Sequence, residues 1–179
     1  MPSLLLEIGC EELPASACRA AEEQLPRLCS EHVGAPPSEL YVGPRRLAFL
    51  VGELPERTPD EWLKGPPEAL RERAAAGFAK RHGVRAEELT VRDGFLGVEL
   101  PGRPIRDVLP DRLAAVVRGL QFGKSMRWDA SGHRFSRPVR WICEKLDEET
   151  IGGGYSYGRR FAYGRVEVVS AQAYAAAPL

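Results

Sequence analysis

Two short apolar runs constrain the fold of this chain more than any other feature. The first, Leu4–Ile8, is closed by Gly9, and the second, Leu47–Val51, follows Gly43-Pro44-Arg45-Arg46. Each run is short for a helix but long enough for a buried strand. Helical patterns lie between and after them, without a strict strand–helix–strand rhythm. We therefore expect an α+β fold with a mixed, mainly antiparallel sheet packed with about three helices.

Three stretches of the chain place apolar residues at helical spacing. The first opens at Glu11–Pro14, where acidic side chains and proline suit the first turn of a helix, and Pro26 within it predicts a kink or a restart. The second covers residues 68–82, and Gly83 is placed to cap its C-terminal end. The third begins near Val108. We expect these helices to pack on the sheet.

The stretches between the helices differ in character. Residues 55–67 are polar and contain four prolines, which predicts an extended connection. Asp93-Gly94 lies within a loosely alternating stretch and predicts a hairpin. Residues 139–146 fit either a strand or a short helix. The length of 179 residues fits one domain or two subdomains, 1–100 and 101–179.

Charge is distributed unevenly along the chain, although the formal net charge is zero. Residues 1–31 carry six Glu and two Arg, whereas residues 118–141 carry six basic residues and one Asp. Neutrality excludes a wholly basic nucleic-acid binder but not a local basic face. The basic stretch also contains four aromatic residues, namely Phe122, Trp128, Phe135 and Trp141.

Basic residues interleaved with aromatic ones predict RNA contact. Arginine pairs with phosphates, and aromatic rings and guanidinium planes stack on unpaired bases. An alternative stays open, in which the aromatic residues lie in the core and the arginines are solvated or paired with glutamates.

Common catalytic motifs are absent from the sequence. It has no phosphate-binding loop, no glycine-rich dinucleotide fingerprint, no nucleophile elbow and no zinc-protease motif. The four cysteines form no C-x-x-C pair, so we expect core or surface thiols and no metal site. An independent small-molecule enzyme would have only Glu7, Glu11 and Glu12 as obvious acid–base candidates. No signal peptide or membrane span is apparent, and we expect a cytosolic protein.

Six motifs together resemble the N-terminal part of the bacterial glycyl-tRNA synthetase β subunit, and they follow in the order of that family. They are LLLEIGCEELPA (Leu4–Ala15), PRRLAFLV (Pro44–Val51), LKGPP (Leu63–Pro67), AAAGFAKRHGV (Ala74–Val84), KSMRW (Lys124–Trp128) and RFSRPVRW (Arg134–Trp141). The resemblance covers essentially the whole chain. The sequence differs from the family pattern at two positions. Gly123 stands where the family usually has proline, and Arg159 stands where the family's G-H-R-F pattern has histidine.

The resemblance implies a cytoplasmic heterotetramer of two α and two β subunits. In that family the α subunit activates glycine with ATP and magnesium, whereas the β subunit supplies tRNA recognition and is needed for aminoacylation. The implied partners are the α subunit and tRNA(Gly), with no membrane, and this chain is expected to hold no cofactor and no catalytic centre. The HD-like and anticodon-binding domains of the family are missing, so we expect an N-terminal fragment.

Two roles remain for such a fragment. In the first it supports glycylation through tRNA recognition, α–β assembly or both. In the second it is a purely structural assembly module without direct RNA contact. The family match does not identify contact residues, so the candidates rest on charge and aromatic pattern. The predicted RNA-binding residues are Arg45, Arg46, Lys64, Lys124, Arg127, Trp128, Arg134, Arg137, Arg140 and Arg160.

Overall fold

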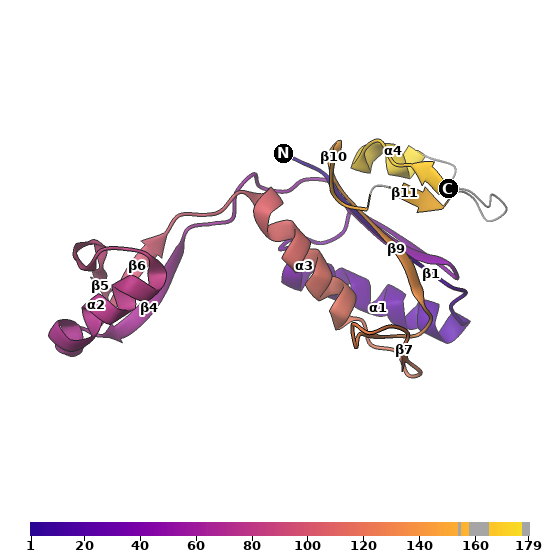
Figure 1. The fold of residues 1–179 in the computed structure, drawn as a ribbon. Coiled ribbons are helices and arrows are strands. Elements are labelled where there is room, and N and C mark those ends of the chain that lie inside the picture. The colour runs from indigo at the N-terminus through magenta and orange to yellow at the C-terminus, as the bar shows by residue number, and fades with distance from the viewer. Residues whose placement is uncertain (154, 158–164, 177–179) are drawn as a thin grey trace. The chain divides into compact units, whose positions relative to one another are not determined.

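The chain divides into two compact units, of which one is inserted into the other. The computed structural model describes residues 1–153, 155–157 and 165–176. The first unit comprises Met1–Glu56 and Ile105–Leu179, and the second comprises Arg57–Pro104 (Figure 1). The expected division after residue 100 lies close to the second crossing between the units. The first crossing, after Glu56, was not predicted as a boundary, because the polar, proline-containing stretch over residues 55–67 was interpreted only as a connection.

A five-stranded antiparallel sheet forms the centre of the first unit, and β1 is its middle strand. The two apolar runs lie side by side in it, with Leu6 opposite Phe49. Every strand pairing among the described residues is antiparallel, which confirms the expected fold class. The strand order is β10 (Glu149–Gly152), β9 (Val139–Leu146), β1 (Leu4–Cys10), β3 (Arg46–Val51) and β2 (Glu39–Gly43).

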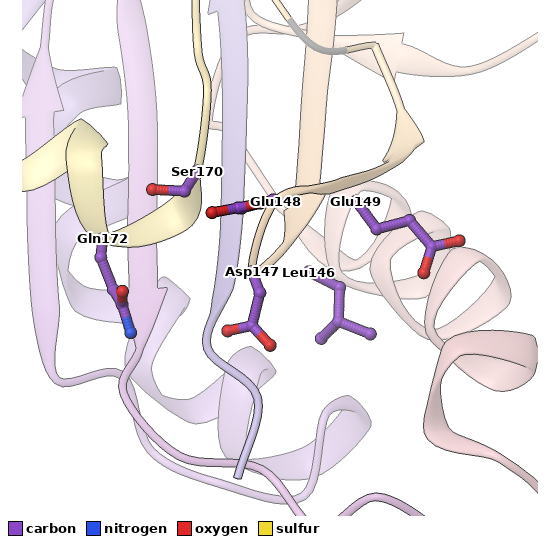
Figure 2. Close-up of a pocket in the computed structure, with 6 residues that line it drawn as sticks. All are labelled: Leu146, Asp147, Glu148, Glu149, Ser170 and Gln172. Carbon is purple, nitrogen blue, oxygen red and sulfur yellow. The ribbon is translucent and has the colours of Figure 1, made fainter.

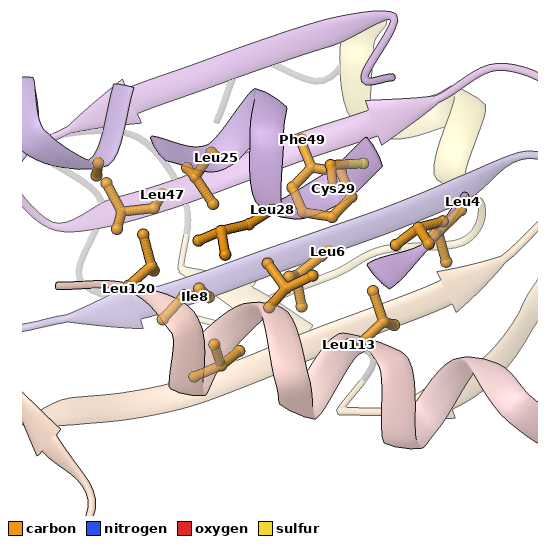
Figure 3. Packing of buried hydrophobic residues seen from close by; sticks show 14 of the residues in the cluster. Leu4, Leu6, Ile8, Leu25, Leu28, Cys29, Leu47, Phe49, Leu113 and Leu120 are labelled. Atoms are coloured by element: carbon orange, nitrogen blue, oxygen red, sulfur yellow. The ribbon is translucent and has the colours of Figure 1, made fainter. Parts of the chain in front are cut away.

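Two helices cover one face of this sheet, as Figure 3 shows. They are α1 (Ala15–His32) and α3 (Ile105–Gly119). Leu6 and Ile8 of β1 meet Leu25 of α1 and Leu113 of α3, and all four are at most 1% exposed. Burying a leucine side chain contributes roughly 1.5–3 kcal/mol, so this layer accounts for much of the stability of the unit.

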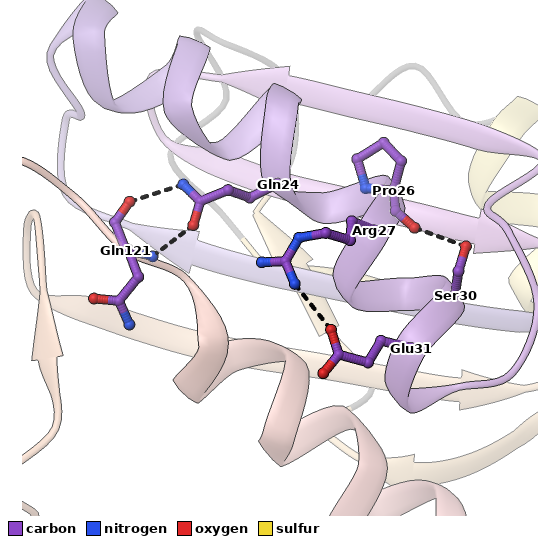
Figure 4. Close-up of polar contacts among 6 residues, drawn as sticks. All are labelled: Gln24, Pro26, Arg27, Ser30, Glu31 and Gln121. Carbon is purple, nitrogen blue, oxygen red and sulfur yellow. Dashed lines mark hydrogen bonds and ion pairs between the residues drawn. The ribbon is translucent and has the colours of Figure 1, made fainter.

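Helix α1 continues through Pro26 and does not restart there. Proline lacks the N–H that would bond to the preceding turn, so one backbone hydrogen bond is lost. Polar contacts around this point stabilise the helix (Figure 4). Ser30 Oγ donates to the Pro26 carbonyl at 2.9 Å. The Gln24 side chain bonds to both backbone groups of Gln121, at 2.8 and 2.9 Å, and so fastens α1 to the segment after α3.

The other face of the sheet is covered by the C-terminal elements, which explains why β1 is buried on both sides. Leu5 and Cys143 on this face pack with Val168, Ala171 and Tyr174. A strand buried on both faces lacks the alternation of polar and apolar residues that a one-sided sheet shows. The elements here are β11 (Tyr155–Tyr157), β12 (Arg165–Glu167) and α4 (Ala171–Ala176). No helix in the described part of the chain is both long and apolar enough to cross a membrane.

The inserted unit is a three-stranded sheet with one helix. Phe78 and Ala79 of α2 pack on Leu96 and Val98 of the sheet. Gly83, at φ +69°, caps α2 as predicted. The elements are β4 (Glu61–Pro67), the short turn η1 (Glu68–Leu70), α2 (Arg71–His82), the short turn η2 (Ala86–Glu88), β5 (Thr90–Arg92) and β6 (Phe95–Leu100), with strand order β4-β6-β5.

Strand β4 corrects the expected extended connection over residues 55–67. Its residues pair with β6 from Glu61 onward, with a register shift between Lys64 and Pro67. Proline is tolerated in this strand because β4 lies at the edge of the sheet. The hairpin at Asp93-Gly94 is confirmed, and both residues have positive φ, at 52° and 76°.

The two connections between the units form a neck in which the outgoing and returning chains pair. Thr58 N donates to Arg103 O at 2.9 Å, and Arg103 N donates to Thr58 Oγ1 at 2.9 Å. Gly102 makes this close pairing possible, because a Cβ there would lie 1.7 Å from the Thr58 carbonyl oxygen. On the other side of the boundary, Ile105 N donates to Glu56 O at 2.8 Å.

Candidate nucleic-acid interface

Three of the sequence motifs meet at one end of the five-stranded sheet. Antiparallel pairing places Gly9, near the end of β1, opposite both Arg46 at the start of β3 and Trp141 in β9. Cys10 N donates to Arg45 O at 2.9 Å, and Glu11 N to a carbonyl in the RFSRPVRW segment at 3.0 Å. We call this region the sheet end and define it as residues 7–12, 44–46 and 137–141.

Glutamates of the first motif offset most of the arginines at the sheet end. Arg140 forms an ion pair with the Glu11 carboxylate, and Arg45 lies 3.9 Å from that of Glu12. Arg137 Nε donates to the Glu12 carbonyl at 3.3 Å. Exposed pairs of this kind contribute about 0–1 kcal/mol to stability. Their larger effect is to lower the positive potential that a phosphate would meet.

Beneath these exposed pairs, Glu7 is fully buried and hydrogen-bonded. Trp141 Nε1 donates to one oxygen of its carboxylate and Tyr174 Oη to the other. Arg46 Nη1 lies 3.7 Å from Glu7, and its guanidinium also lies over the Tyr174 ring. Burial, followed by the charge of Glu7, raises the pKa of Tyr174 well above its usual value, so the phenol stays protonated. Glu7 therefore acts as a structural hub and Arg46 as its counterion.

Gly9 is what allows Trp141 to reach Glu7. A Cβ at this position would lie 1.7 Å from the indole ring, so the ring lies directly against the backbone of β1. Trp141 and Tyr174 were not predicted to be partners of Glu7. One signal was available, since a carboxylate within an apolar strand requires buried hydrogen-bond donors.

A second basic region follows α3, in residues 124–135, and we call it the basic hairpin. Two short strands form it, β7 (Met126–Arg127) and β8 (Arg134–Phe135). The basic stretch after α3 therefore contains a small two-stranded hairpin. Asp129 Oδ1 accepts hydrogen bonds from the hydroxyl and the backbone N–H of Ser131, and these bonds lower the pKa of Asp129. Trp128 Nε1 donates to Phe135 O at 2.9 Å, which fixes the indole.

The basic hairpin keeps its positive charge. Lys124 and Arg127 are exposed, and neither side chain forms an ion pair within the described residues. Arg134 Nη2 donates to the Ser125 carbonyl at 2.7 Å, an uncharged partner. Two apolar side chains lie among these cations, because Met126 is 60% exposed and Trp128 is 38% exposed.

Two predicted residues lie apart from both regions. Lys64 belongs to the inserted unit, where its Nζ lies 3.4 Å from the centroid of the Phe95 ring. Arg160, with the neighbouring Arg159, lies outside the described residues. The sheet end thus brings together four of the ten candidates, and the basic hairpin brings together another four.

A hollow of about 500 Å³ at the opposite end of β9 does not suit phosphate (Figure 2). Asp147, Glu148 and Glu149 contribute to its lining, and carboxylates repel an anion. Asp147 is also engaged structurally, since Ser3 donates to its Oδ1 through both N and Oγ at 2.8 Å.

The cysteines behave as core residues. Burial raises the pKa of Cys10 and of Cys29 to about 12, so both remain protonated at neutral pH. A protonated thiol is a poor nucleophile and a poor metal ligand. The described residues contain no group of three or more side chains suited to holding a metal ion.

Comparison with known proteins gives one consistent family. A family model described as glycyl-tRNA synthetase beta subunit matches residues 4–177. The chain is 33% identical over 97% of its length to the glycine–tRNA ligase beta subunit of Thermotoga maritima, and 35% identical over 96% to that of Moorella thermoacetica. It is 36% identical over 84% of its length to the beta subunit of Acaryochloris marina. The chain spans 24–30% of the length of these curated relatives.

Proposed function

This chain belongs to the glycyl-tRNA synthetase β-subunit family, and from that membership we propose that it supports glycylation of tRNA(Gly) by contributing to tRNA recognition. In this proposal it acts as part of the β subunit of a cytoplasmic α2β2 enzyme. The α subunit carries out the chemistry with ATP and magnesium, and this chain holds no cofactor. The absence of common catalytic motifs from the sequence agrees with this assignment of the chemistry to the α subunit.

The observation that carries the proposal is the uncompensated charge of the basic hairpin. Lys124 and Arg127 are exposed without a carboxylate partner in the described part of the chain, and Trp128 lies beside them. Phosphates pair with such cations, and an exposed indole edge or face can pack against sugar and base. In this proposal the sheet end has a different role, which is to hold the three motifs together.

A second candidate function is docking of the α subunit on the same hairpin. Exposed Met126 and Trp128 favour it, because methionine and aromatic residues are enriched in protein interfaces. The two candidates differ in what the cations do. RNA contact makes binding strongly dependent on salt, whereas an apolar protein interface depends on salt only weakly.

The test is steady-state aminoacylation by the whole α/β enzyme carrying Lys124→Ala together with Arg127→Ala. We expect KM for tRNA to rise about tenfold with kcat little changed, and the slope of log affinity against log salt to fall by about 2. The control is Arg19→Ala with Arg27→Ala, which removes the same charge from exposed positions of α1.

The outcomes separate the two candidates. Unchanged tRNA kinetics in the hairpin variant would contradict RNA contact by these residues. Loss of co-elution with the α subunit on a sizing column, at every salt concentration, would instead favour the docking function. Equal effects of the hairpin variant and the α1 control would mean that only total charge matters.

A further inference from the structure

The inserted unit presents a sheet face with an unusual composition. Helix α2 covers one face of its sheet (Figure 1). Phe78 of this helix packs there on apolar strand residues. Strand residues alternate between faces, so the other side carries a different set. We call it the open face, and its residues are Trp62, Lys64, Thr90, Arg92, Phe95, Gly97 and Glu99.

Trp62 is held flat against this face. Gly97 makes room for it, because a Cβ at that position would lie 2.3 Å from the indole. Trp62 Nε1 donates to Thr90 Oγ1 at 3.1 Å, across the full width of the sheet. The Arg92 guanidinium lies over the ring with its Cζ 5.3 Å from the centroid, and Glu99 orients it through a 2.9 Å ion pair. The result is a layer of backbone, indole and guanidinium.

A second ring and cation lie beside the first pair. Lys64 Nζ is 3.4 Å from the centroid of the Phe95 ring. In the sheet register, Phe95 is the direct neighbour of Arg92, and Lys64 is the direct neighbour of Gly97. Two aromatic rings and two exposed cations thus share a small surface. Its only carboxylate, Glu99, is already paired with Arg92, so the face has a net positive charge.

Unpaired RNA matches this surface in both shape and charge. Bases splayed from a single strand stack on aromatic rings and on guanidinium planes, and the phosphates between them pair with lysine and arginine. A duplex fits poorly, since its bases are already stacked within the helix. An acidic peptide would satisfy the cations but would place no aromatic plane on the Arg92 guanidinium, which lies over the Trp62 ring.

We infer that the open face of the inserted unit binds unpaired nucleotides of RNA, with Lys64 and Arg92 contacting phosphates and Trp62 and Phe95 supporting stacked bases. The inference deepens the proposed function and rests on it in one respect, which is that the polyanion is RNA. It adds a site in the inserted unit, in which Trp62, Arg92 and Phe95 were not among the predicted contacts.

Fluorescence anisotropy of the full chain with a labelled oligoadenylate of roughly 12 nucleotides, a length that covers one such site, tests the inference. The variant is Lys64→Ala with Arg92→Ala. We expect the dissociation constant to rise about tenfold, and the slope of log affinity against log salt to fall by about 1.4, because each phosphate contact on a single strand contributes about 0.7. A second variant, Trp62→Leu, removes the ring that supports the Arg92 guanidinium plane while keeping both cations, and we expect it to weaken binding about fivefold.

The matched control is Lys80→Ala with Arg81→Ala, two exposed cations of α2, the helix that covers the other face. It should change affinity less than twofold. All titrations are repeated in a Lys124→Ala, Arg127→Ala background, so that loss of the hairpin contacts and loss of the open-face contacts are separated. Circular dichroism of each variant confirms that its fold is retained.

Three results would overturn the inference while leaving the function of the basic hairpin intact. The first is no binding of oligoadenylate in the hairpin background. The second is an equal loss in the open-face variant and the α2 control. The third is equally tight binding of a labelled oligoglutamate of the same length, since the face would then recognise charge alone.

Discussion

The sheet end and the basic hairpin look alike in sequence and differ in the folded chain. Both combine arginines with tryptophan, yet the sheet end meets Glu7, Glu11 and Glu12 of the first motif. The basic hairpin meets no carboxylate from another segment among the described residues, and its one acid, Asp129, bonds to Ser131. A count of charges along the sequence therefore overstates the positive potential of the sheet end but not that of the basic hairpin.

This difference comes from strand pairing. The acidic segment at residues 1–31 and the basic segment at 118–141 are far apart in the chain, but antiparallel pairing of β1 with β9 places their ends together. Charges that are segregated along the sequence therefore neutralise one another in the folded chain. The basic hairpin is not neutralised in this way. It precedes β9 in the chain, and its strands pair with each other and not with a strand of residues 1–31.

The strongest test of the contrast is removal of the buried carboxylate at the sheet end. Glu7→Ala should lower the free energy of unfolding by about 3 kcal/mol, because it leaves Trp141 and Tyr174 without their acceptor and the partly buried Arg46 without its counterion. Glu12→Ala, at an exposed carboxylate, should change it by less than about 0.5 kcal/mol. Urea denaturation followed by tryptophan fluorescence measures both. Similar small values for the two variants would mean that the sheet end is no more structural than the surface.

The aromatic residue of the basic hairpin gives the next largest effect. Trp128→Ala should weaken tRNA binding by the whole enzyme about tenfold, since loss of one stacking contact costs roughly 1–3 kcal/mol. Trp128→Phe keeps a ring and should recover most of the affinity. Filter binding of labelled tRNA at fixed salt provides the measurement. If alanine and phenylalanine behave alike, the indole serves the hairpin fold through its bond to Phe135 and not RNA.

Neutralising the exposed glutamates of the sheet end should make the two regions more alike. Glu11→Gln with Glu12→Gln frees Arg140 and Arg45, so we expect affinity for tRNA to rise about twofold to threefold and its salt dependence to become steeper. The same filter-binding assay measures the change. Glu22→Gln with Glu23→Gln on α1 is the charge-matched control. An increase of equal size in that control would show a general charge effect.

The smallest expected effect concerns Glu144, a carboxylate that forms no ion pair within the described part of the chain. Burial raises the pKa of Glu144 above its ordinary value of 4.5, so the folded state favours its protonated form. Its contribution therefore becomes unfavourable as pH rises through the raised pKa. Glu144→Gln should be slightly more stable than the parent at pH 7, and this advantage should vanish below about pH 4.5. Thermal unfolding at pH 4 and pH 7 tests this, and an advantage at both pH values would contradict it.

Local signals were sufficient for much of the fold. The apolar runs predicted β1 and β3, Gly83 predicted the end of α2, and Asp93-Gly94 predicted the β5–β6 hairpin. Each depends on residues close together in the chain. The sequence did not reveal β4, because prolines suggest a connection unless the strand lies at an edge.

The candidate interface was harder to predict than the fold. Arg140 and Arg127 have the same residue type and similar neighbours, and only their spatial partners distinguish them. The counterion role of Arg46 depends on Glu7 and Tyr174, which come from opposite ends of the chain. Such partners follow from register and topology, which no local pattern of residues specifies.

The neck between the units also bears on the order of folding. Glu56 and Ile105 are hydrogen-bonded although the whole of Arg57–Pro104 separates them in the chain. Closing so long a loop costs conformational entropy, and contacts distant in sequence slow folding. When the inserted sheet forms early, its neck already holds both chain ends together, and β3 is joined to α3 by the equivalent of a tight turn. In that order of folding, the inserted unit lowers the conformational entropy cost of bringing β3 and α3 together in the larger unit.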